Sequence, residues 1–247
     1  MELRILPTYP ALCRAVANRI ADQIRQKPAA LVCLASGHSP LGVFECLVAD
    51  VQQGNLDISG CTFVGLDEWL GMNGTDPGSC RHMMDESFFL PLQIPAAQIA
   101  FFDGKATNPD AEVQRINELI DRQGGLDVML VGIGTNGHIA MNEPGTPFQT
   151  RAHISTLAEE TKTVGQKYFS SATPLDKGIT LGLHHFATAG LPLLMANGSR
   201  KAPILKRLFE EDVSEQLPAS IVHQVPRAVV MVDQEAAAQM PSVTAIH

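Results

Sequence analysis

Short apolar runs alternate along the chain with longer segments whose apolar positions recur every three or four residues. The runs are residues 31–35, 61–66, 128–131, 179–181, 193–196 and 227–232. An uninterrupted apolar run of this length is typical of a strand buried on both faces of a parallel sheet. The Val-rich run 128–131, bounded by glycines, is expected to be the central strand.

The periodic segments predict helices that cover such a sheet. They are residues 9–26, 41–51, 80–90, 108–125, the segment that begins near Lys201, and a short Ala-rich segment after residue 232. Residues 146–157 are expected to be irregular and then extended, whereas 161–169 is too weakly periodic to assign. Strands that alternate with helices predict an α/β fold with three layers and a mostly parallel central sheet.

Composition narrows the class of protein. With 247 residues, 45% of them hydrophobic, the chain can bury the core of a single domain, expected to span residues 1–247. It has no apolar run near the roughly 20 residues that span a bilayer, and its first residues lack a signal-peptide core. We therefore expect a cytoplasmic location without membrane association. The five cysteines are scattered, which favours reduced thiols and offers no paired spacing for a metal site.

The formal net charge of −8 argues against a nucleic-acid partner, and no arginine-rich run or aromatic platform accompanies it. An anionic ligand must therefore be held by local features. The sequence is compatible with a homo-oligomer but does not determine one.

Candidate chemistry follows the central strand. Gly132, Gly134 and Gly137 surround His138, and Glu143 lies five residues beyond the histidine. The carboxyl edge of an open α/β sheet is where ligands bind, and a His/Glu pair suits acid–base work. Taken alone, the pattern fits a tight loop with a hydrogen-bonded histidine equally well.

A second loop, residues 36–40, follows the run 31–35 and precedes a helix. Small residues at a helix start aim backbone N–H groups and serine hydroxyls at one spot, which suits a phosphate. The alternative is a plain N-cap at Ser39 followed by Pro40. Lys201 begins a further helix, where a cation is unfavourable unless an anion binds; an ordinary solvated lysine is the alternative.

Asp67 and Glu68 directly follow the apolar run 61–66. Because successive side chains of a strand point to opposite faces, at most one of the two carboxylates is expected to face a site. Asp67 is our choice of base, and Glu68 is expected to meet a structural partner.

Together these motifs resemble the glucosamine-6-phosphate deaminase/isomerase family, and more closely its galactosamine-6-phosphate isomerase branch. The resemblance covers almost the whole chain. Its anchors are Ser36-Gly37-His38-Ser39-Pro40, Leu66-Asp67-Glu68-Trp69, Gly132-Ile133-Gly134-Thr135-Asn136-Gly137-His138, Asn142-Glu143-Pro144 and Gly198-Ser199-Arg200-Lys201.

The resemblance implies a modified Rossmann-like fold and a reaction without metal or organic cofactor. A 2-amino-2-deoxyhexose 6-phosphate becomes a ketose 6-phosphate plus ammonia: galactosamine 6-phosphate gives tagatose 6-phosphate, or, in the alternative, glucosamine 6-phosphate gives fructose 6-phosphate. By resemblance, Asp67 moves a proton between C2 and C1, while His138 with Glu143 assists ring opening. The implied phosphate ligands are Ser36, Gly37, His38, Ser39, Lys201 and Lys167, the last standing where many deaminases have arginine.

One departure concerns Asn136, which stands where glucosamine-6-phosphate deaminases usually have an aspartate that orients the histidine. An amide oxygen can accept the imidazole N–H but cannot stabilise an imidazolium by charge. We therefore expect Asn136 to contribute to catalysis without charge and Glu143 to supply the negative charge near His138.

Two alternatives fit less well. The 6-phosphogluconolactonases share the fold and a similar Gly-rich His motif, but typically continue into Ser-Leu-Phe-Pro, whereas this chain has Met141-Asn142-Glu143-Pro144. A sugar-phosphate sensor would normally carry a DNA-binding domain, for which the sequence shows no candidate, and would not need Asp67, His138 and Glu143 together.

Overall fold

The computed structural model describes residues 1–241 and contains a seven-stranded sheet in the order β1-β10-β9-β6-β2-β3-β5. Every neighbouring pair in this sheet is parallel. The strands are β1 (Glu2–Leu6), β2 (Leu31–Leu34), β3 (Thr62–Gly65), β5 (Ile99–Ala100), β6 (Val128–Val131), β9 (Leu191–Ala196) and β10 (Val229–Asp233). The predicted parallel sheet is confirmed, with β6 at its centre; the predicted domain 1–247 ends in residues 242–247, outside the described part.

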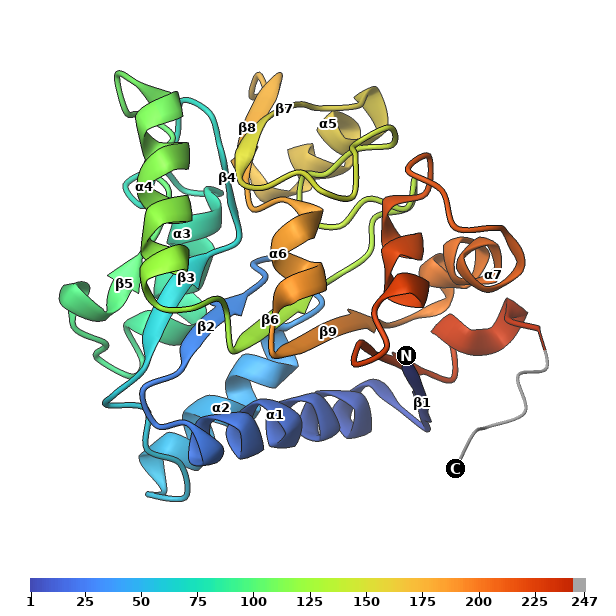
Figure 1. The fold of residues 1–247 in the computed structure, drawn as a ribbon, viewed down its shortest axis with the longest axis horizontal. Helices are drawn as coiled ribbons and strands as arrows, with labels where there is room; N and C mark the ends of the chain where they lie inside the picture. Colours follow the sequence, from blue (N-terminus) through green and yellow to red (C-terminus); the bar gives the residue numbers. More distant parts are fainter. Residues whose placement is uncertain (242–247) are drawn as a thin grey trace.

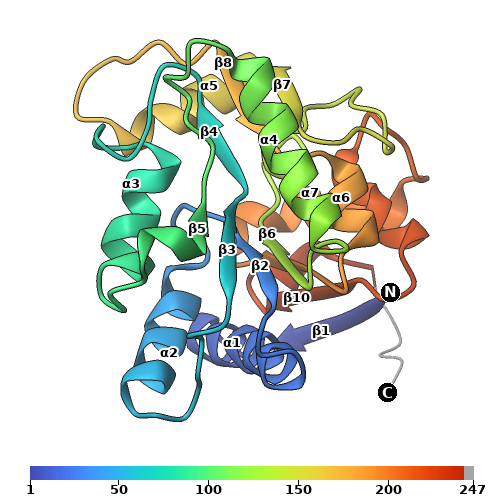
Figure 2. The same cartoon turned by 60° about the vertical axis from the view of Figure 1, so that its left-hand side comes forward.

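Helices cover both faces of this sheet. One face carries α1 (Tyr9–Gln26), α2 (Leu41–Gln52) and α3 (Cys80–Met84); the other carries α4 (Pro109–Arg122), α6 (Leu183–Thr188) and α7 (Ala202–Glu210). Figures 1 and 2 show α1 and α2 side by side at the bottom of both views. Along β6, Val128 and Leu130 pack on the first face and Met129 and Val131 on the second, so the central strand is buried on both sides.

The strand order reverses between β2 and β6. The chain leaves β2 towards β3 on one side, whereas β6 is followed by β9 on the other. Loops that diverge in this way open a crevice at the carboxyl ends of the two strands, which is the usual ligand position in an open α/β sheet.

A second, three-stranded sheet lies beyond that edge, in the order β4-β8-β7, and both of its pairs are antiparallel. Its strands are β4 (Asp67–Trp69), β8 (Lys177–Thr180) and β7 (His153–Thr156), at the top of Figure 1. The apolar run 179–181, which its pattern grouped with the strands of the main sheet, contributes to β8 of the small sheet instead. The acidic three-residue β4 gave no strand signal, because its side chains lack an apolar alternation.

The remaining elements are short. Helix α5 (Glu159–Gly165) and a 3-10 helix (Gln166–Tyr168) form the segment that the sequence left unassigned, and a π-helical turn (Asp85–Phe89) continues α3 through the predicted helix 80–90. Further 3-10 helices span Ala96–Gln98, Ser199–Lys201, Pro218–Gln224 and Ala236–Gln239, the last at the predicted Ala-rich position. Among the described residues, no helix is long and apolar enough to cross a membrane.

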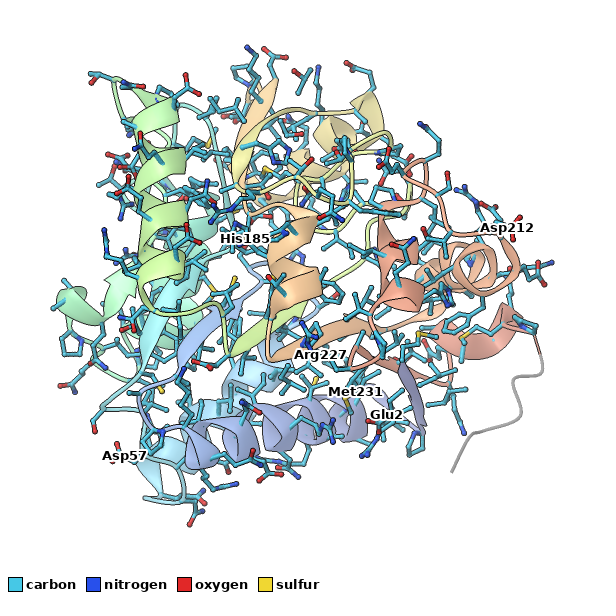
Figure 3. All side chains as sticks on the ribbon, viewed as in Figure 1. Glu2, Asp57, His185, Asp212, Arg227 and Met231 are labelled. Atoms are coloured by element: carbon cyan, nitrogen blue, oxygen red, sulfur yellow. The ribbon has the colours of Figure 1, made fainter. Side chains whose placement is uncertain are left out.

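Two labelled side chains in Figure 3 fasten α6 to its surroundings. The His185 ring nitrogen Nε2 lies 2.9 Å from Asn117 Oδ1 of α4, and burial lowers the pKa of this histidine to about 4. Arg227 donates from Nε and Nη2 to the Ala189 and Ala187 carbonyls, both at 2.6 Å. These are structural contacts, because neither side chain reaches the crevice between β2 and β6.

Candidate active site

A cavity of about 230 Å³ occupies the crevice at the carboxyl ends of β2 and β6, between the main sheet, β4 and α5. It is lined by most of the sequence-predicted site residues: Ser36, Gly37, His38, Ser39, Asp67, His138, Lys167 and Lys201. Asn136 and Glu143 stand behind His138 rather than on the cavity wall. The structure therefore gathers five segments that are far apart in the sequence.

The turn 36–40 folds tightly around Gly37, which has a φ of +96°. A Cβ at Gly37 would lie 2.8 Å from the Tyr168 hydroxyl, so the glycine is needed both for the turn and for this close approach. The Tyr168 ring stacks on His38 with centroids 5.2 Å apart. Pro40, not Ser39, occupies the N-cap position of helix α2, so the plain Ser39 N-cap alternative is wrong.

Positive charge gathers beside this turn. Lys201 lies at the start of α7 and its Nζ donates to the Ile133 carbonyl at 2.6 Å. Burial, and then the charge of Lys167, lower the pKa of Lys201; burial and the charge of Arg200 lower the pKa of Lys167. A cation whose pKa is lowered by a neighbouring positive charge is stabilised when an anion binds beside it.

Asp67 reaches the cavity from β4, where it pairs with Thr180 of β8. Burial, opposed by a hydrogen bond from the Cys80 thiol and assisted by the negative charge of Glu68, raises the pKa of Asp67 to about 7. A carboxyl group with this pKa is partly ionised at neutral pH and can both take and return a proton.

Glu68 has the structural role that strand alternation predicts for one of the two carboxylates. It is fully buried and accepts the backbone N–H groups of Trp69, Cys80 and Arg81, each at 2.9 Å. Because Cys80 and Arg81 begin α3, this carboxylate ties the start of α3 to β4 and so fixes Asp67 beside it.

His138 is oriented by a group of polar side chains. Its Nδ1 lies 3.1 Å from Thr161 Oγ1 and 3.6 Å from Glu143 Oε2. Burial disfavours the charge on Glu143, but hydrogen bonds to His138 and Thr161 outweigh it and lower its pKa. A Cβ at Gly134 would lie 2.4 Å from His138 Nε2, so the glycine makes room for the ring.

Asn136 contacts the backbone of His138 and the side chain of Glu143. Its Oδ1 accepts the backbone N–H of His138 at 3.1 Å, not the imidazole N–H, and its Nδ2 donates to Glu143 Oε2 at 2.8 Å. The turn directs the amide oxygen to the backbone of the histidine and not to its ring. Asn136 therefore holds Glu143, which in turn faces the ring.

The cavity residues that sequence reasoning missed include Cys80, Thr161 and Tyr168. Thr161 and Tyr168 lie in the segment 161–169, to which the sequence assigned no secondary structure. The one hint of a site in this segment was Lys167. Cys80 was considered only as a scattered thiol. Within residues 1–241, no group of three or more His, Cys, Asp or Glu side chains is arranged to hold a metal ion.

Comparison with known proteins adds relatives over almost the full length. A family model described as glucosamine-6-phosphate isomerases/6-phosphogluconolactonase matches residues 8–231. Glucosamine-6-phosphate deaminase 1 of Bacillus subtilis (strain 168) is 36% identical over 242 residues, covering 98% of this chain and 100% of the relative. Putative deaminase AgaI of Escherichia coli (strain K12) is 36% identical over 220 residues, covering 89% of this chain and 87% of the relative.

Solved structures agree with this relationship. A monomeric glucosamine-6-phosphate deaminase superposes with a TM-score of 0.93 at 35% identity, covering 97% of this chain and 100% of the other. A 6-phosphogluconolactonase from Trypanosoma brucei has a TM-score of 0.75 at 19% identity, covering 97% and 98%. The second likeness shows a shared fold alone.

Proposed function

Because the chain belongs to the glucosamine-6-phosphate isomerase/6-phosphogluconolactonase family, we propose that it deaminates a 2-amino-2-deoxyhexose 6-phosphate to a ketose 6-phosphate. The observation that carries this proposal is the shared cavity: a carboxyl group with a pKa of about 7, an oriented histidine, and two lysines beside the turn 36–40 face the same space. Deaminases among the full-length relatives support the same reaction.

The phosphate would bind at one end of the cavity. The Ser36–Ser39 turn offers backbone N–H groups and hydroxyls at the start of α2, and Lys201 and Lys167 add charge. Lysine supplies that charge without the two-pronged geometry of arginine. Anchoring the phosphate fixes the sugar's other end over Asp67, which converts binding energy into orientation.

Ring opening is assigned to His138. The ring must lose a proton from O1 and gain one at O5, which suits an imidazole beside the Glu143 carboxylate. Asp67 then takes the proton from C2 of the open aldehyde while the C2 ammonium gives one proton to O1, which leaves a C1–C2 enol with an amino group on C2. Asp67 returns its proton to C1, which leaves a protonated imine at C2. Water adds to the resulting C2 imine, and its C–N bond breaks to release ammonia.

The epimer at C4 is the finer part of the proposal. Relatives named glucosamine-6-phosphate deaminase favour glucosamine 6-phosphate at least as strongly as Asn136 favours galactosamine 6-phosphate. We keep galactosamine 6-phosphate as the proposed substrate and glucosamine 6-phosphate as the second candidate. Asn136 donates to Glu143, and an aspartate there would place two like charges in contact.

The test is kcat/KM for ammonia release, measured side by side on the two epimers. We expect ammonia from both and the higher kcat/KM with galactosamine 6-phosphate. A higher value with glucosamine 6-phosphate would overturn the epimer assignment alone. No ammonia from either, with hydrolysis of 6-phosphogluconolactone, would overturn deamination and favour the lactonase alternative; sugar-phosphate binding without turnover would favour a sensor.

A further inference from the structure

Helix α2 begins with a residue that cannot cap it. Pro40 stands at the N-cap, and its ring has no group that accepts a hydrogen bond from the first turn. Its carbonyl accepts the Val43 and Phe44 N–H groups at 2.9 and 3.0 Å. The Gly42 N–H needs another partner.

That partner is the phenol of Tyr9, the first residue of α1. Tyr9 Oη accepts the Gly42 N–H at 3.0 Å and donates to the Ser39 carbonyl, also at 3.0 Å. The single phenol oxygen of Tyr9, on α1, thus caps α2 and also holds the Ser39 carbonyl in the turn 36–40. Tyr9 itself is absent from the cavity wall, so it would act on a ligand only through the turn.

The residues around Tyr9 allow its phenol to come this close to α2. A Cβ at Gly42 would lie 3.2 Å from Tyr9 Oη and 2.7 Å from Cys13 Sγ, so only glycine lets the phenol approach. Burial raises the pKa of Tyr9 to about 12, so the phenol keeps the proton that it donates to Ser39.

We infer that Tyr9 is a positioning residue that sets the phosphate affinity of the turn 36–40 by capping α2 and bonding the Ser39 carbonyl. With this carbonyl held by the phenol, its negative end is kept from turning towards a phosphate. The inference rests on the proposed function, because it takes the turn to be the phosphate site.

The test is Tyr9→Phe, which keeps the ring and removes only the bridging oxygen. The variant loses both hydrogen bonds of the phenol. We expect KM for the amino-sugar phosphate, and Kd for inorganic phosphate by calorimetry, to rise about three- to tenfold, a ratio that corresponds to the free energy of a neutral hydrogen bond. The kcat should stay within about twofold, because Asp67 and His138 do not contact Tyr9.

The matched control is Asn108→Ala. Asn108 Oδ1 caps α4 by accepting the Ala111 N–H at 3.2 Å, away from the cavity. This variant loses a helix cap as Tyr9→Phe does and should lower Tm, but it should leave KM and the phosphate Kd unchanged. A purely structural role for Tyr9 would make the two variants behave alike.

Gly42→Ala disturbs the same contact by changing the residue that Tyr9 caps and leaving Tyr9 itself intact. Alanine favours the helix, yet its Cβ would push the phenol away, so the phosphate Kd should rise even where Tm does not fall. Unchanged phosphate Kd in both Tyr9→Phe and Gly42→Ala would overturn the inference. Failure of the wild type to release ammonia would overturn the proposed function instead, and leave the phosphate measurement to decide the role of Tyr9.

Discussion

Two adjacent carboxylates, Asp67 and Glu68, differ in role because their surroundings differ: Glu68 is structural, whereas Asp67 faces the cavity. Three backbone N–H groups satisfy Glu68, whereas Asp67 faces the cavity with the Cys80 thiol as a hydrogen-bonding neighbour. Strand alternation predicted this division from the sequence. The contribution of Cys80 was not predictable, because it depends on where α3 begins relative to β4.

The raised pKa of Asp67 predicts a pH profile. The base works only when ionised, so kcat/KM should fall as pH drops through about 7. Because the Cys80 thiol lowers the pKa of Asp67, Cys80→Ala should move this acidic limb to higher pH. Cys61→Ala, which removes a buried thiol outside the cavity, should leave the profile in place. An acidic limb that Cys80→Ala leaves unmoved would contradict the role given to the thiol.

Among the helices and strands, the strand-turn-helix unit β2–α2 is the one that the sequence predicts most fully. The apolar run, the small-residue turn and the restored helical periodicity all predicted it. Strand β4 and the small sheet were not predictable, because three acidic and aromatic residues carry no strand pattern and their partner β8 lies over a hundred residues away. Helix α5 was missed for a similar reason, and with it Thr161 and Tyr168.

The turn after β2 predicts the effect of a single methyl group. Gly37→Ala should raise KM by roughly tenfold or more, because a left-handed φ costs a non-glycine residue about 1–3 kcal/mol and the Cβ would strike Tyr168. Gly54→Ala is the control: Gly54 has a φ of +74° with nothing within 4 Å of a Cβ. It should lower stability and leave KM unchanged. Equal KM for both variants would show that the Gly37 turn does not hold the phosphate.

At the scale of the whole molecule, the topology creates the site. The strand order reverses between β2 and β6, and the small sheet brings Asp67 over the crevice from a third direction. The sequence predicted the sheet edge on which the motifs meet. It could not predict the strand order, since many orders are compatible with the same alternation of strands and helices.

The net charge of the chain bears on how the cavity can attract a phosphate. The chain carries −8 overall, yet Lys167 and Lys201 share one cavity wall with the start of α2. A net negative molecule does not attract anions at long range, so affinity for a sugar phosphate must come from contacts inside the cavity. Removing the Asp67 carboxylate, the proposed base, should therefore impair chemistry and spare phosphate binding.

The most direct measurement is ammonia release by Asp67→Asn together with its phosphate affinity. The account predicts that kcat falls by about 10²–10⁴-fold, the usual contribution of a positioned general base, while Kd for inorganic phosphate stays within about twofold. An Asp67→Asn enzyme that releases ammonia at close to the wild-type kcat would contradict the account.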